Sequence, residues 1–384
     1  MSMFKFFRHF RNVLRFTGLP ASERRLTFYS EGKNYWPHLG GMVEYILDNS
    51  DIKLNFITSD TNDPVHKLSH SNLSVFLIDQ GPVRNWLFEN IETDLFIMTM
   101  PDIHQYQVKR SKHPVHYLYT QHSLLSLQMV YRAGAFDHYD TIFCCGPHHI
   151  REMRAIEQAG GLKPKTLVEH GYPWLDAIIK EAAAKPSKPK KEDALCKHVL
   201  IAPSWGPKGV IESGVGQTLT QQLLDQGHKV TLRPHPETLK HARPQVEAIL
   251  RSHKTNPNFV FEENVAGQDS LHLSDVMITA WSGAAFDYAL GLGKPVISVD
   301  VPKKINNPDY QDIPLIPMEI DVRAKLGQVI SPDELEALDL KTLSPPPNDL
   351  TKEFLFNLGQ SVQVGGDWII DFVQNSSNAT KVSS

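Results

Sequence analysis

The 384-residue chain has few cysteines, no long apolar run and almost no net charge. Its three cysteines include the adjacent pair Cys144 and Cys145, and no Cys-x-x-Cys pair occurs. This pattern excludes a disulfide framework and a cysteine zinc site, and it favours a reducing compartment. No apolar run approaches the roughly eighteen residues that span a bilayer, and the N-terminus lacks the apolar core of a signal peptide. The sequence therefore predicts a cytoplasmic protein.

The charge balance gives no field that would hold a polyanion. Lys and Arg together number 39 and Asp and Glu 43, so the formal net charge is -4. We therefore expect no nucleic-acid partner. Hydrophobic residues make up 41% and charged residues 21% of the chain, which is typical of globular proteins. At about 150 residues per domain, the length predicts two to three domains.

The first 17 residues form an amphipathic pattern. At about 100° per residue, one arc is apolar and aromatic, and the opposite arc is basic with no acidic residue. This pattern is typical of a helix that lies on an anionic membrane surface. The alternative, a first helix packed on the protein's own core, stays open. The residues predicted to contact the membrane are Phe6, Phe7, Phe10 and Leu14, with Lys5, Arg8, Arg11 and Arg15. We expect peripheral attachment to the inner face of the cell membrane.

Short β-branched or aromatic runs then alternate with helical stretches in two successive series. This predicts two doubly wound, Rossmann-like α/β domains that face a cleft. Strands are expected at residues 26–30, 54–58, 74–78, 95–99, 115–120, 141–144, 166–168, 198–202, 229–233, 259–261, 276–279 and 296–299. The expected parts are a membrane-surface helix at 1–18, an acceptor-side first domain at 25–182, a linker at 183–195, a nucleotide-donor-binding second domain at 196–345, a helix returning to the first domain at 346–374 and a disordered tail at 375–384.

Ligands of open α/β sheets bind beyond the carboxyl ends of the strands, so the loops there are the candidate sites. In the second domain, Arg233-Pro234-His235-Pro236 follows a strand, and its prolines fix one imidazole and one guanidinium for a phosphate. The alternative is a surface turn in which His235 caps a helix. Ser282-Gly283 precedes a helix whose N-terminus could hold a phosphate, although such a pair often serves only as a cap.

Two further loops carry candidate residues. Ser204 and Trp205 follow the first strand of the second domain and could contact a nucleotide, although Trp205 could equally pack on its own domain. His122 follows a strand of the first domain and could deprotonate an acceptor hydroxyl, although a lone histidine is more often structural. No HExxH motif or facial triad occurs, so we predict no metal and no cofactor.

These blocks together resemble the CDP-glycerol glycerophosphotransferase family, the polymerases and primases of teichoic-acid-like polymers, which have the two-domain GT-B fold. The resemblance spans roughly residues 115–300. The matching blocks are Gln121-His122-Ser123, Gly171-Tyr172-Pro173 with Asp176, Ala202-Pro203-Ser204-Trp205, Arg233-Pro234-His235-Pro236, and Ile278-Thr279-Ala280-Trp281-Ser282-Gly283 with Asp287-Tyr288. The chain departs from the family where Ser123-Leu124 replaces Gly-Thr, where residues 280–283 replace Asp-Tyr-Ser-Ser, and where Trp174 replaces Arg.

The resemblance implies that His122 is the base and His235 holds the donor phosphates. The implied donor site also contains Arg233, Ser282, Gly283, Ser204, Trp205, Asp287 and Gly171. The implied reaction moves glycerol phosphate, or a similar polyol phosphate, from a CDP-activated donor to a hydroxyl of a lipid-linked or surface polysaccharide such as capsule or teichoic acid. CMP is released, and the basic N-terminal helix would bring the enzyme to its acceptor on the membrane.

Two other functions stay open at this point. A GT-B glycosyltransferase with a nucleotide sugar would use the same phosphate loop but attack an anomeric carbon. A non-catalytic subunit of a polysaccharide-synthesis complex would explain the altered residues after His122 and at 280–283. The second alternative predicts that His122→Ala leaves function unchanged.

Overall fold

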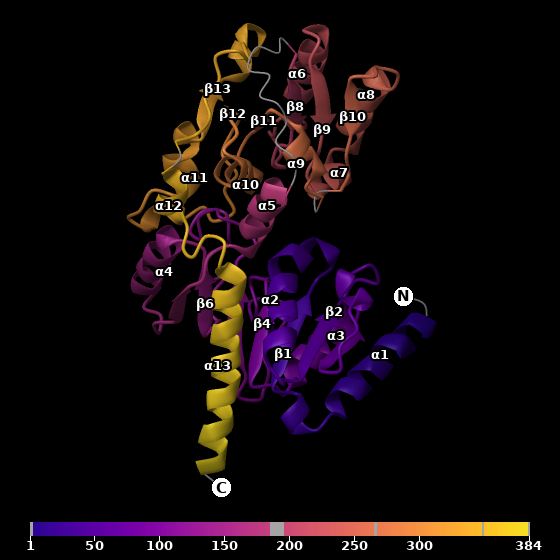
Figure 1. The fold of residues 1–384 in the computed structure, drawn as a ribbon, viewed down its shortest axis with the longest axis vertical. Coiled ribbons are helices and arrows are strands. Elements are labelled where there is room, and N and C mark those ends of the chain that lie inside the picture. The colour runs from indigo at the N-terminus through magenta and orange to yellow at the C-terminus, as the bar shows by residue number, and fades with distance from the viewer. Residues whose placement is uncertain (1–2, 185–195, 265–266, 348, 383–384) are drawn as a thin grey trace.

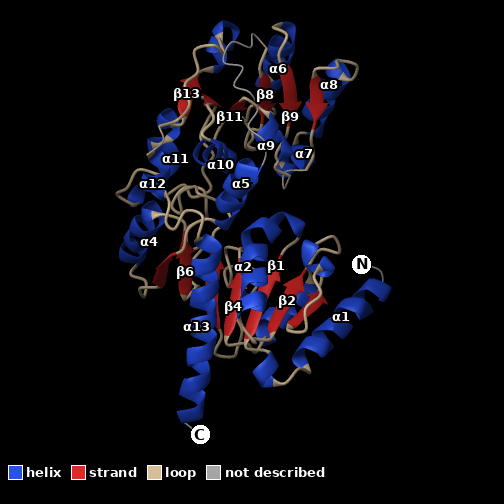
Figure 2. Ribbon diagram, viewed as in Figure 1, coloured by secondary structure: helices blue, strands red, loops and turns tan. Residues whose placement is uncertain are grey.

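The computed structural model describes residues 3–184, 196–264, 267–347 and 349–382. Two α/β domains lie one above the other along the long axis, the first below and the second above in Figure 1. Most of the expected linker, residues 185–195, lies outside the described residues. Each domain is built around a parallel sheet with helices on both faces, as Figure 2 shows most clearly for the first domain.

The sheet of the first domain has the order β3-β2-β1-β4-β5-β6-β7, and its strands pair in parallel. Its strands are β1 (Leu26–Ser30), β2 (Leu54–Thr58), β3 (Leu73–Leu77), β4 (Leu95–Met98), β5 (His116–Thr120), β6 (Thr141–Cys144) and β7 (Thr166–Glu169). Every residue of β1, β2, β4 and β6 is buried, as expected for strands covered on both faces. This order brings the carboxyl ends of β1, β2 and β3 side by side.

The sheet of the second domain has the order β10-β9-β8-β11-β12-β13, also parallel. Its strands are β8 (His198–Ile201), β9 (Lys229–Leu232), β10 (Phe259–Phe261), β11 (Val276–Thr279), β12 (Val296–Val299) and β13 (Gly327–Ile330). The expected strands lie within one residue of the observed ones, but β13 was not predicted. The fold is therefore two doubly wound domains.

The helices of the first series are α1 (Met3–Thr17), α2 (Trp36–Asn49), α3 (Pro82–Asn90), α4 (Pro147–Gly160) and α5 (Pro173–Ala184). Those of the second series are α6 (Val215–Asp225), α7 (Pro236–His241), α8 (Arg243–His253), α9 (Asp269–Leu273), α10 (Gly283–Leu292) and α11 (Met318–Asp321), and the chain ends with α12 (Leu350–Phe354) and α13 (Ser361–Val382). Proline opens α3, α4, α5 and α7, where its fixed φ suits the first turn and its missing N–H costs nothing. None of the described helices is both long and apolar enough to cross a bilayer.

Two apolar layers cover the sheet of the first domain. On one face, Val13 of α1, Leu87 of α3 and Met153 of α4 join the strand side chains in one core cluster. On the other face, Met42 of α2 packs with Ile369 of α13. Helix α13 thus belongs to the first domain although it ends the chain, and it lies along α2. It continues to Val382, so residues 375–382, where we expected a disordered tail, are helical.

Helix α1 covers the outer edge of the sheet of the first domain at β3 (Figure 1). Asn12 and His9 donate hydrogen bonds to the carbonyl oxygen of Leu77, at 2.9 and 3.2 Å. Phe16 is fully buried and meets the ring of Phe76 edge to face at 5.4 Å. An exposed edge strand invites pairing with other chains, and this helix protects it. One face of α1 therefore packs on the protein's own core.

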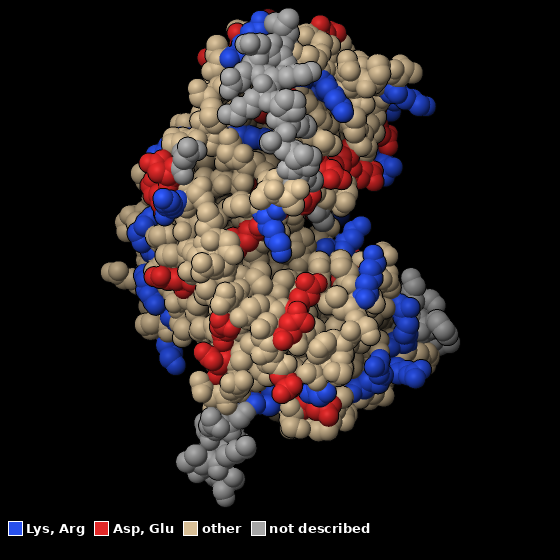
Figure 3. All heavy atoms as spheres, viewed as in Figure 1, with Lys and Arg blue, Asp and Glu red and all other residues tan. Residues whose placement is uncertain are grey.

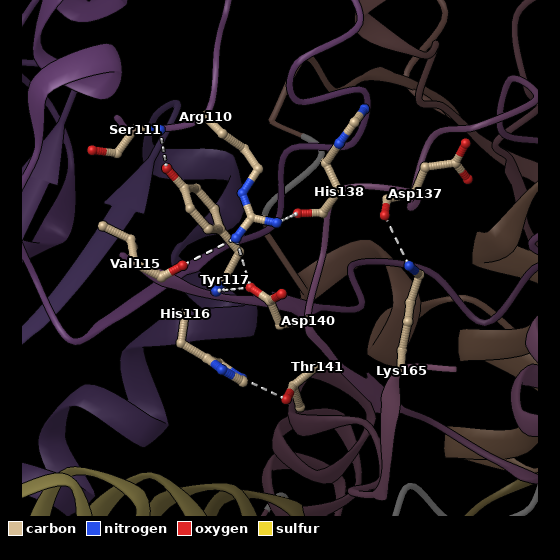
Figure 4. A network of polar contacts seen from close by, with 10 residues as sticks. All are labelled: Arg110, Ser111, Val115, His116, Tyr117, Asp137, His138, Asp140, Thr141 and Lys165. Carbon is tan, nitrogen blue, oxygen red and sulfur yellow. Dashed lines mark hydrogen bonds and ion pairs between the residues drawn. The ribbon is translucent and has the colours of Figure 1, made fainter. Parts of the chain in front are cut away.

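Polar contacts tie together the amino ends of the central strands, opposite the cleft. The Arg110 guanidinium donates to the carbonyl oxygens of His138 and Val115 and to Asp140 Oδ2, at 2.9 to 3.0 Å (Figure 4). It also lies 4.4 Å from the ring centre of Tyr117. Asp140 in turn accepts from the Tyr117 amide at 2.8 Å. This network orders the loops that lead into β5 and β6, and so supports the strands that carry the site.

A single apolar cluster joins the two domains. Leu124 and Cys145 of the first domain pack in it with Phe286 and Ala289 of α10 in the second. Helix α5 contributes Leu175 and contacts both α2 and α10. The shared cluster holds the carboxyl ends of the two sheets toward each other.

Candidate active site

A cleft of about 1010 Å³ lies between the domains, lined by loops that follow strands of both sheets. Figure 3 shows it as a hollow between the upper and lower lobes, open on the right. Its C-terminal half is formed by residues after β8, β9 and β11, including Arg233, His235 and Ser282. Its N-terminal half is formed by residues after β1, β2 and β3, and His122 lies after β5. This is the position where open α/β sheets bind ligands.

His122 is held in one tautomer by two tyrosines. Its Nδ1 lies 3.1 Å from the Tyr119 hydroxyl, which donates its own proton to the Tyr131 hydroxyl at 3.3 Å. Tyr119 must therefore accept from Nδ1–H, which leaves Nε2 without a proton. Burial lowers the pKa of His122 to about 4; a hydrogen bond to the Thr99 backbone opposes this shift, and the positive charge of Lys304 adds to it. His122 is therefore a neutral imidazole with a basic nitrogen at the cleft.

His235 is held in the opposite tautomer by the helix that it caps. It is the N-cap of α7, and its Nδ1 accepts a hydrogen bond from the Glu237 amide at 3.1 Å. Its proton is therefore on Nε2, which makes that nitrogen a donor. Burial lowers the pKa of His235 to about 4, and Lys304 lowers it further. The capping role left open from the sequence is present, and the same ring also lines the cleft.

The loop that carries His122 is clamped by both domains. Glu319 of the second domain accepts from the Ser126 amide at 2.9 Å and from its hydroxyl at 2.6 Å. Glu152 of α4 accepts from the Leu127 amide. Asn307 donates its side chain to the Gln128 carbonyl at 2.9 Å. These bonds fix His122 relative to the second domain, so its distance from the donor loops is set by buried polar contacts.

Arg233 and Ser282 line the C-terminal half of the cleft, and Gly283 follows Ser282 at the start of α10. The Arg233 guanidinium is buried and donates to the Gly267 carbonyl at 3.2 Å and to Ser270 Oγ at 3.1 Å. Ser282 caps α10: its hydroxyl accepts from the Ala284 amide at 3.3 Å and its carbonyl oxygen from the Ala285 amide at 3.2 Å, so both of these amides already have partners. A Cβ on Gly283 would lie 3.0 Å from Ser123 Oγ, so glycine lets α10 approach the His122 loop. A helix N-terminus beside a guanidinium suits a phosphate group.

Asp287 of α10 meets Trp174 of α5 across the domain boundary. Trp174 Nε1 donates to Asp287 Oδ2 at 3.0 Å. Asp287 Oδ1 is buried without a hydrogen-bond partner among the described residues. Burial raises the pKa of Asp287 to about 7, although the bond from Trp174 and the charge of Arg233 oppose this shift. Both side chains line the cleft, so the tryptophan that replaces the family's arginine contacts Asp287 through a neutral donor.

Four residues predicted for the donor site are not among those that line the cleft: Ser204, Trp205, Gly171 and Gly283. Ser204 and Trp205 are not among the side chains that line the cleft, although their neighbours Ala202 and Pro203 are. The Trp205 ring stacks on His241 at 5.7 Å, within its own domain. Gly171 has a φ of +101°, and a Cβ there would meet the carbonyl oxygen of Phe356 at 2.7 Å. Gly171 therefore makes room for the returning C-terminal segment.

Lys304 is a residue that the sequence did not single out. It follows β12, and its Nζ lies 5.6 Å from the ring centre of Trp205. Burial lowers its pKa, and its charge lowers the pKa values of both His122 and His235. No ion pair of Lys304 occurs in the described part of the chain. Lys304 is not among the residues that line the cleft, so it acts on the two histidines through its charge.

Acidic residues in the N-terminal half of the cleft were also missed. Glu31, Asp60 and Asp79 line it, each one or two residues after β1, β2 and β3. The signal in the sequence was a carboxylate directly after three successive strands. No group of His, Cys, Asp and Glu in the described residues is arranged to hold a metal ion.

The exposed face of α1 carries the residues predicted for membrane contact. Phe7, Phe10 and Leu14 are 61%, 40% and 55% exposed. Arg8, Arg11 and Arg15 are also exposed, and basic side chains line this edge of the molecule, at the lower right of Figure 3. The side chains of Lys5 and Phe6 lie outside the described part. Arg8 and His9 line the far end of the cleft, so α1 adjoins its N-terminal half.

Comparisons with known proteins identify the family of the chain. The family model of the CDP-glycerol:poly(glycerophosphate) glycerophosphotransferases matches residues 98–303, more than half of the chain. No curated protein sequence matches.

Solved structures similar to the chain are two-domain enzymes of the GT-B type. The S. aureus MnaA–UDP co-structure has a TM-score of 0.58 at 10% identity, covering 92% of this chain and 97% of that one. The UDP-GlcNAc 2-epimerase of Methanocaldococcus jannaschii has a TM-score of 0.54 at 11% identity, covering 91% and 99%. A Listeria monocytogenes protein described as a UDP-N-acetylglucosamine 2-epimerase has a TM-score of 0.55 at 13% identity, covering 88% and 93%. At these identities the likeness shows the fold alone, which is GT-B-like.

Proposed function

Because the chain belongs to the CDP-glycerol:poly(glycerophosphate) glycerophosphotransferase family and is therefore a transferase, we propose that it moves a polyol phosphate from a CDP-activated donor to an acceptor hydroxyl. Glycerol phosphate is the group that the family name indicates, and CMP is the leaving group. The observation that carries the proposal is the pair of neutral histidines in one cleft. One has a basic nitrogen and the other a donor N–H.

The C-terminal half of the cleft suits the donor. His235 Nε2–H and the Gly283 amide at the start of α10 can donate hydrogen bonds to the phosphates, and Arg233 adds positive charge. These groups are fixed before the ligand arrives, so they stabilise charge on the transferring and departing phosphates without reorganisation. Asp287 lies beside them and can orient a donor hydroxyl.

His122 suits the role of base. The acceptor oxygen attacks the distal phosphorus of the donor, and its proton passes to His122 Nε2. The bond from that phosphorus to the bridging oxygen breaks, and its electron pair leaves with CMP. A pKa of about 4 keeps His122 unprotonated at neutral pH, and its bond to Tyr119 fixes the ring. The products are a phosphodiester and CMP.

Helix α1 suits attachment to an anionic membrane. Its packed face holds it on β3, and its other face presents Phe7, Phe10 and Leu14 beside arginines. Such a helix lies in the interface with its apolar side chains submerged. Because α1 adjoins the cleft, attachment there would bring the site to a lipid-linked acceptor on the inner face of the membrane, as in the synthesis of capsule or teichoic-acid polymers.

The test is release of CMP from CDP-glycerol and CDP-ribitol, with UDP-sugars assayed in parallel. We expect CMP release that falls about 100-fold or more in His122→Ala and in His235→Ala. His113→Ala is the matched control, because His113 lies at the amino end of β5 and pairs with Glu92, far from the cleft.

Each alternative predicts a different product. Release of a nucleoside diphosphate from a sugar donor, with a glycosidic product, would assign the chain to glycosyl transfer instead. A non-catalytic subunit would release neither, and His122→Ala would behave as wild type.

A further inference from the structure

The N-terminal half of the cleft differs in chemistry from the donor half. Glu31, Asp60 and Asp79 follow β1, β2 and β3, which are neighbours in the sheet, so the three carboxylates lie along one edge. None of them has an ion pair among the described residues. The cations that line this half are Arg8 and Lys33, both on exposed side chains. The Arg84 guanidinium donates to the Tyr29 hydroxyl and to Asn85, its charge lowers the pKa of Glu31 against the effect of burial, and its amide lies 3.3 Å from Asp79 Oδ1.

Local backbone amides hold two of these carboxylates in place. Asp60 accepts from the amides of Lys33 at 3.1 Å and Asn62 at 2.8 Å. Asp79 Oδ1 accepts from the Gly81 amide at 3.0 Å, whereas its Oδ2 is buried with no partner in the described part of the chain. The third, Glu31, bonds to Tyr35, and burial raises its pKa. Acceptor capacity therefore remains for hydroxyl donors of a ligand.

An independent feature at the same place also indicates a ligand. His38 lines the cleft, is only 9% exposed, and its Nδ1 has no hydrogen-bond partner among the described residues. Its ring stacks on Tyr172 at 5.6 Å and lies 6.2 Å from the ring of His122. A buried polar atom without a partner costs free energy unless a ligand or water satisfies it. Tyr35 and Trp174 line the same region and offer aromatic faces.

We infer that this half of the cleft binds a neutral sugar residue of the acceptor through its hydroxyl groups, with Glu31, Asp60 and Asp79 as hydrogen-bond acceptors. The inference rests on the proposed phosphotransfer, because it assigns the acceptor of that reaction. Carboxylate oxygens accept bonds from hydroxyls, and they repel the oxygens of a phosphate at close range. A glycerol phosphate chain end would place such oxygens against three carboxylates. A sugar places hydroxyls there and an apolar face on the aromatic rings.

A consequence concerns the length of the product. After one transfer, the acceptor ends in a polyol that a phosphodiester joins to the sugar, and this phosphate no longer suits the subsite. The chain therefore adds one unit to a sugar hydroxyl and does not extend a polyol phosphate polymer.

The experiment measures ligand binding to the full-length protein by saturation-transfer NMR, without any donor. The probes are the methyl glycosides of glucose, galactose, N-acetylglucosamine and N-acetylgalactosamine, and sn-glycerol 3-phosphate. The variants Asp60→Asn and Glu31→Gln remove charge at nearly constant size. Asp51→Asn is the control, since Asp51 precedes β2 at the opposite end of the sheet. Thermal unfolding checks that each variant is folded.

We expect at least one glycoside to bind. Its affinity should fall about 10-fold in Asp60→Asn and in Glu31→Gln, as expected for a lost bond to a charged acceptor, and stay at the wild-type level in Asp51→Asn. Glycerol 3-phosphate, which the donor half can hold, should bind equally well to all variants. Failure of every glycoside to bind, or equal glycoside affinity in all variants, would overturn the inference.

A second measurement separates this inference from the proposed function. CDP-glycerol is added to wild type with each probe, and the products are analysed. Transfer to a glycoside but not to glycerol 3-phosphate supports both proposals. If no donor releases CMP, the phosphotransfer fails, and the binding data still decide whether the sugar subsite exists.

Discussion

The two halves of the cleft differ in what forms them and in how they relate to the family. The C-terminal half presents a guanidinium, an imidazole N–H and a helix N-terminus, all suited to anions. The N-terminal half presents carboxylates and aromatic rings. The family model matches residues 98–303, which include His122 and all of the C-terminal half, whereas Glu31, Asp60, Asp79 and α1 precede it. The residues proposed for catalysis and donor binding thus lie in the segment that matches the family, whereas the residues proposed for acceptor binding precede it.

This difference teaches where variation is tolerated. The donor half depends on backbone amides and on a histidine fixed between prolines, so most substitutions would disturb its geometry. The other half depends on side chains at the ends of edge-side strands, which can change without refolding the sheet. The variants below test whether the two halves of the cleft have separate functions.

The largest effect is expected for Lys304→Met, which removes a charge that influences both histidines. Transfer should fall about 100-fold, the scale for losing one group that stabilises transition-state charge. Because Lys304 lowers the pKa of His122, its loss raises that pKa, and the acid limb of the pH–rate profile moves to higher pH. Lys304→Arg, which keeps the charge, should leave that limb near its wild-type position. A uniform rate loss without a shift of the limb would contradict this role.

A smaller effect, confined to the N-terminal segment, is expected for Leu14→Glu. Flotation with vesicles of phosphatidylcholine and phosphatidylglycerol should weaken about 10-fold, because one submerged side chain becomes charged. CMP release in solution should be retained. Ile316→Glu is the control, since Ile316 is 68% exposed in the second domain. Equal flotation of Leu14→Glu and wild type would remove α1 from the membrane proposal.

Tyr119→Phe should have a modest effect, because Tyr119 positions His122 and does not contact the reacting atoms. Loss of the hydroxyl that accepts from Nδ1–H frees the other tautomer, so kcat should fall about 10-fold or less. The KM for the donor should change little, because the donor half is intact. A larger change in donor KM than in kcat would show that Tyr119 acts on the donor side.

The smallest effect is expected where the two halves are joined, at Glu152. Burial, and next the charge of Glu319, raise the pKa of Glu152 to about 8 from 4.5. A raised carboxyl pKa means that folding favours the protonated form, so stability is lost as pH rises from 4.5 through 8. Glu152→Gln does not titrate and keeps an acceptor for the Leu127 amide. Its Tm should exceed that of wild type by about 3 °C at pH 9 and converge at pH 5. Glu336→Gln, at an exposed position, should show no such pH dependence.

Much of the fold could be predicted because buried parallel strands are short, apolar and β-branched. The predicted strands lie within one residue of the observed ones, from β1 to β12. Strand β13 escaped because Gly327–Ile330 is a half-exposed edge strand without a continuous apolar run. The helical end of α13 was not predicted because Asn and Ser dominate its sequence. Ile369 and Val373 anchor the preceding turns in the core.

Site residues could be predicted where a single loop has a distinctive sequence. They were missed where the site forms only when several distant segments come together. His122 and His235 lie in distinctive loops, and both line the cleft. Lys304 follows β12 in an ordinary polar loop. Asn306 and Asn307 of the same loop donate hydrogen bonds to the loop that carries His122, and these tertiary contacts bring Lys304 close to His122. The three carboxylates are unremarkable singly, because the strand order β3-β2-β1 had to be known before their alignment could be recognised.

The return of α13 to the first domain has a mechanical consequence. The chain passes between the domains twice, once after α5 and again near α12, where Thr351 bonds to Leu290 and Phe356 to Cys145. The two domains would turn most easily about the line that joins these two chain connections. The bonds of Glu319 and Asn307 would hold the His122 loop with the second domain during such a turn, so the movement would admit substrates without separating His122 from His235.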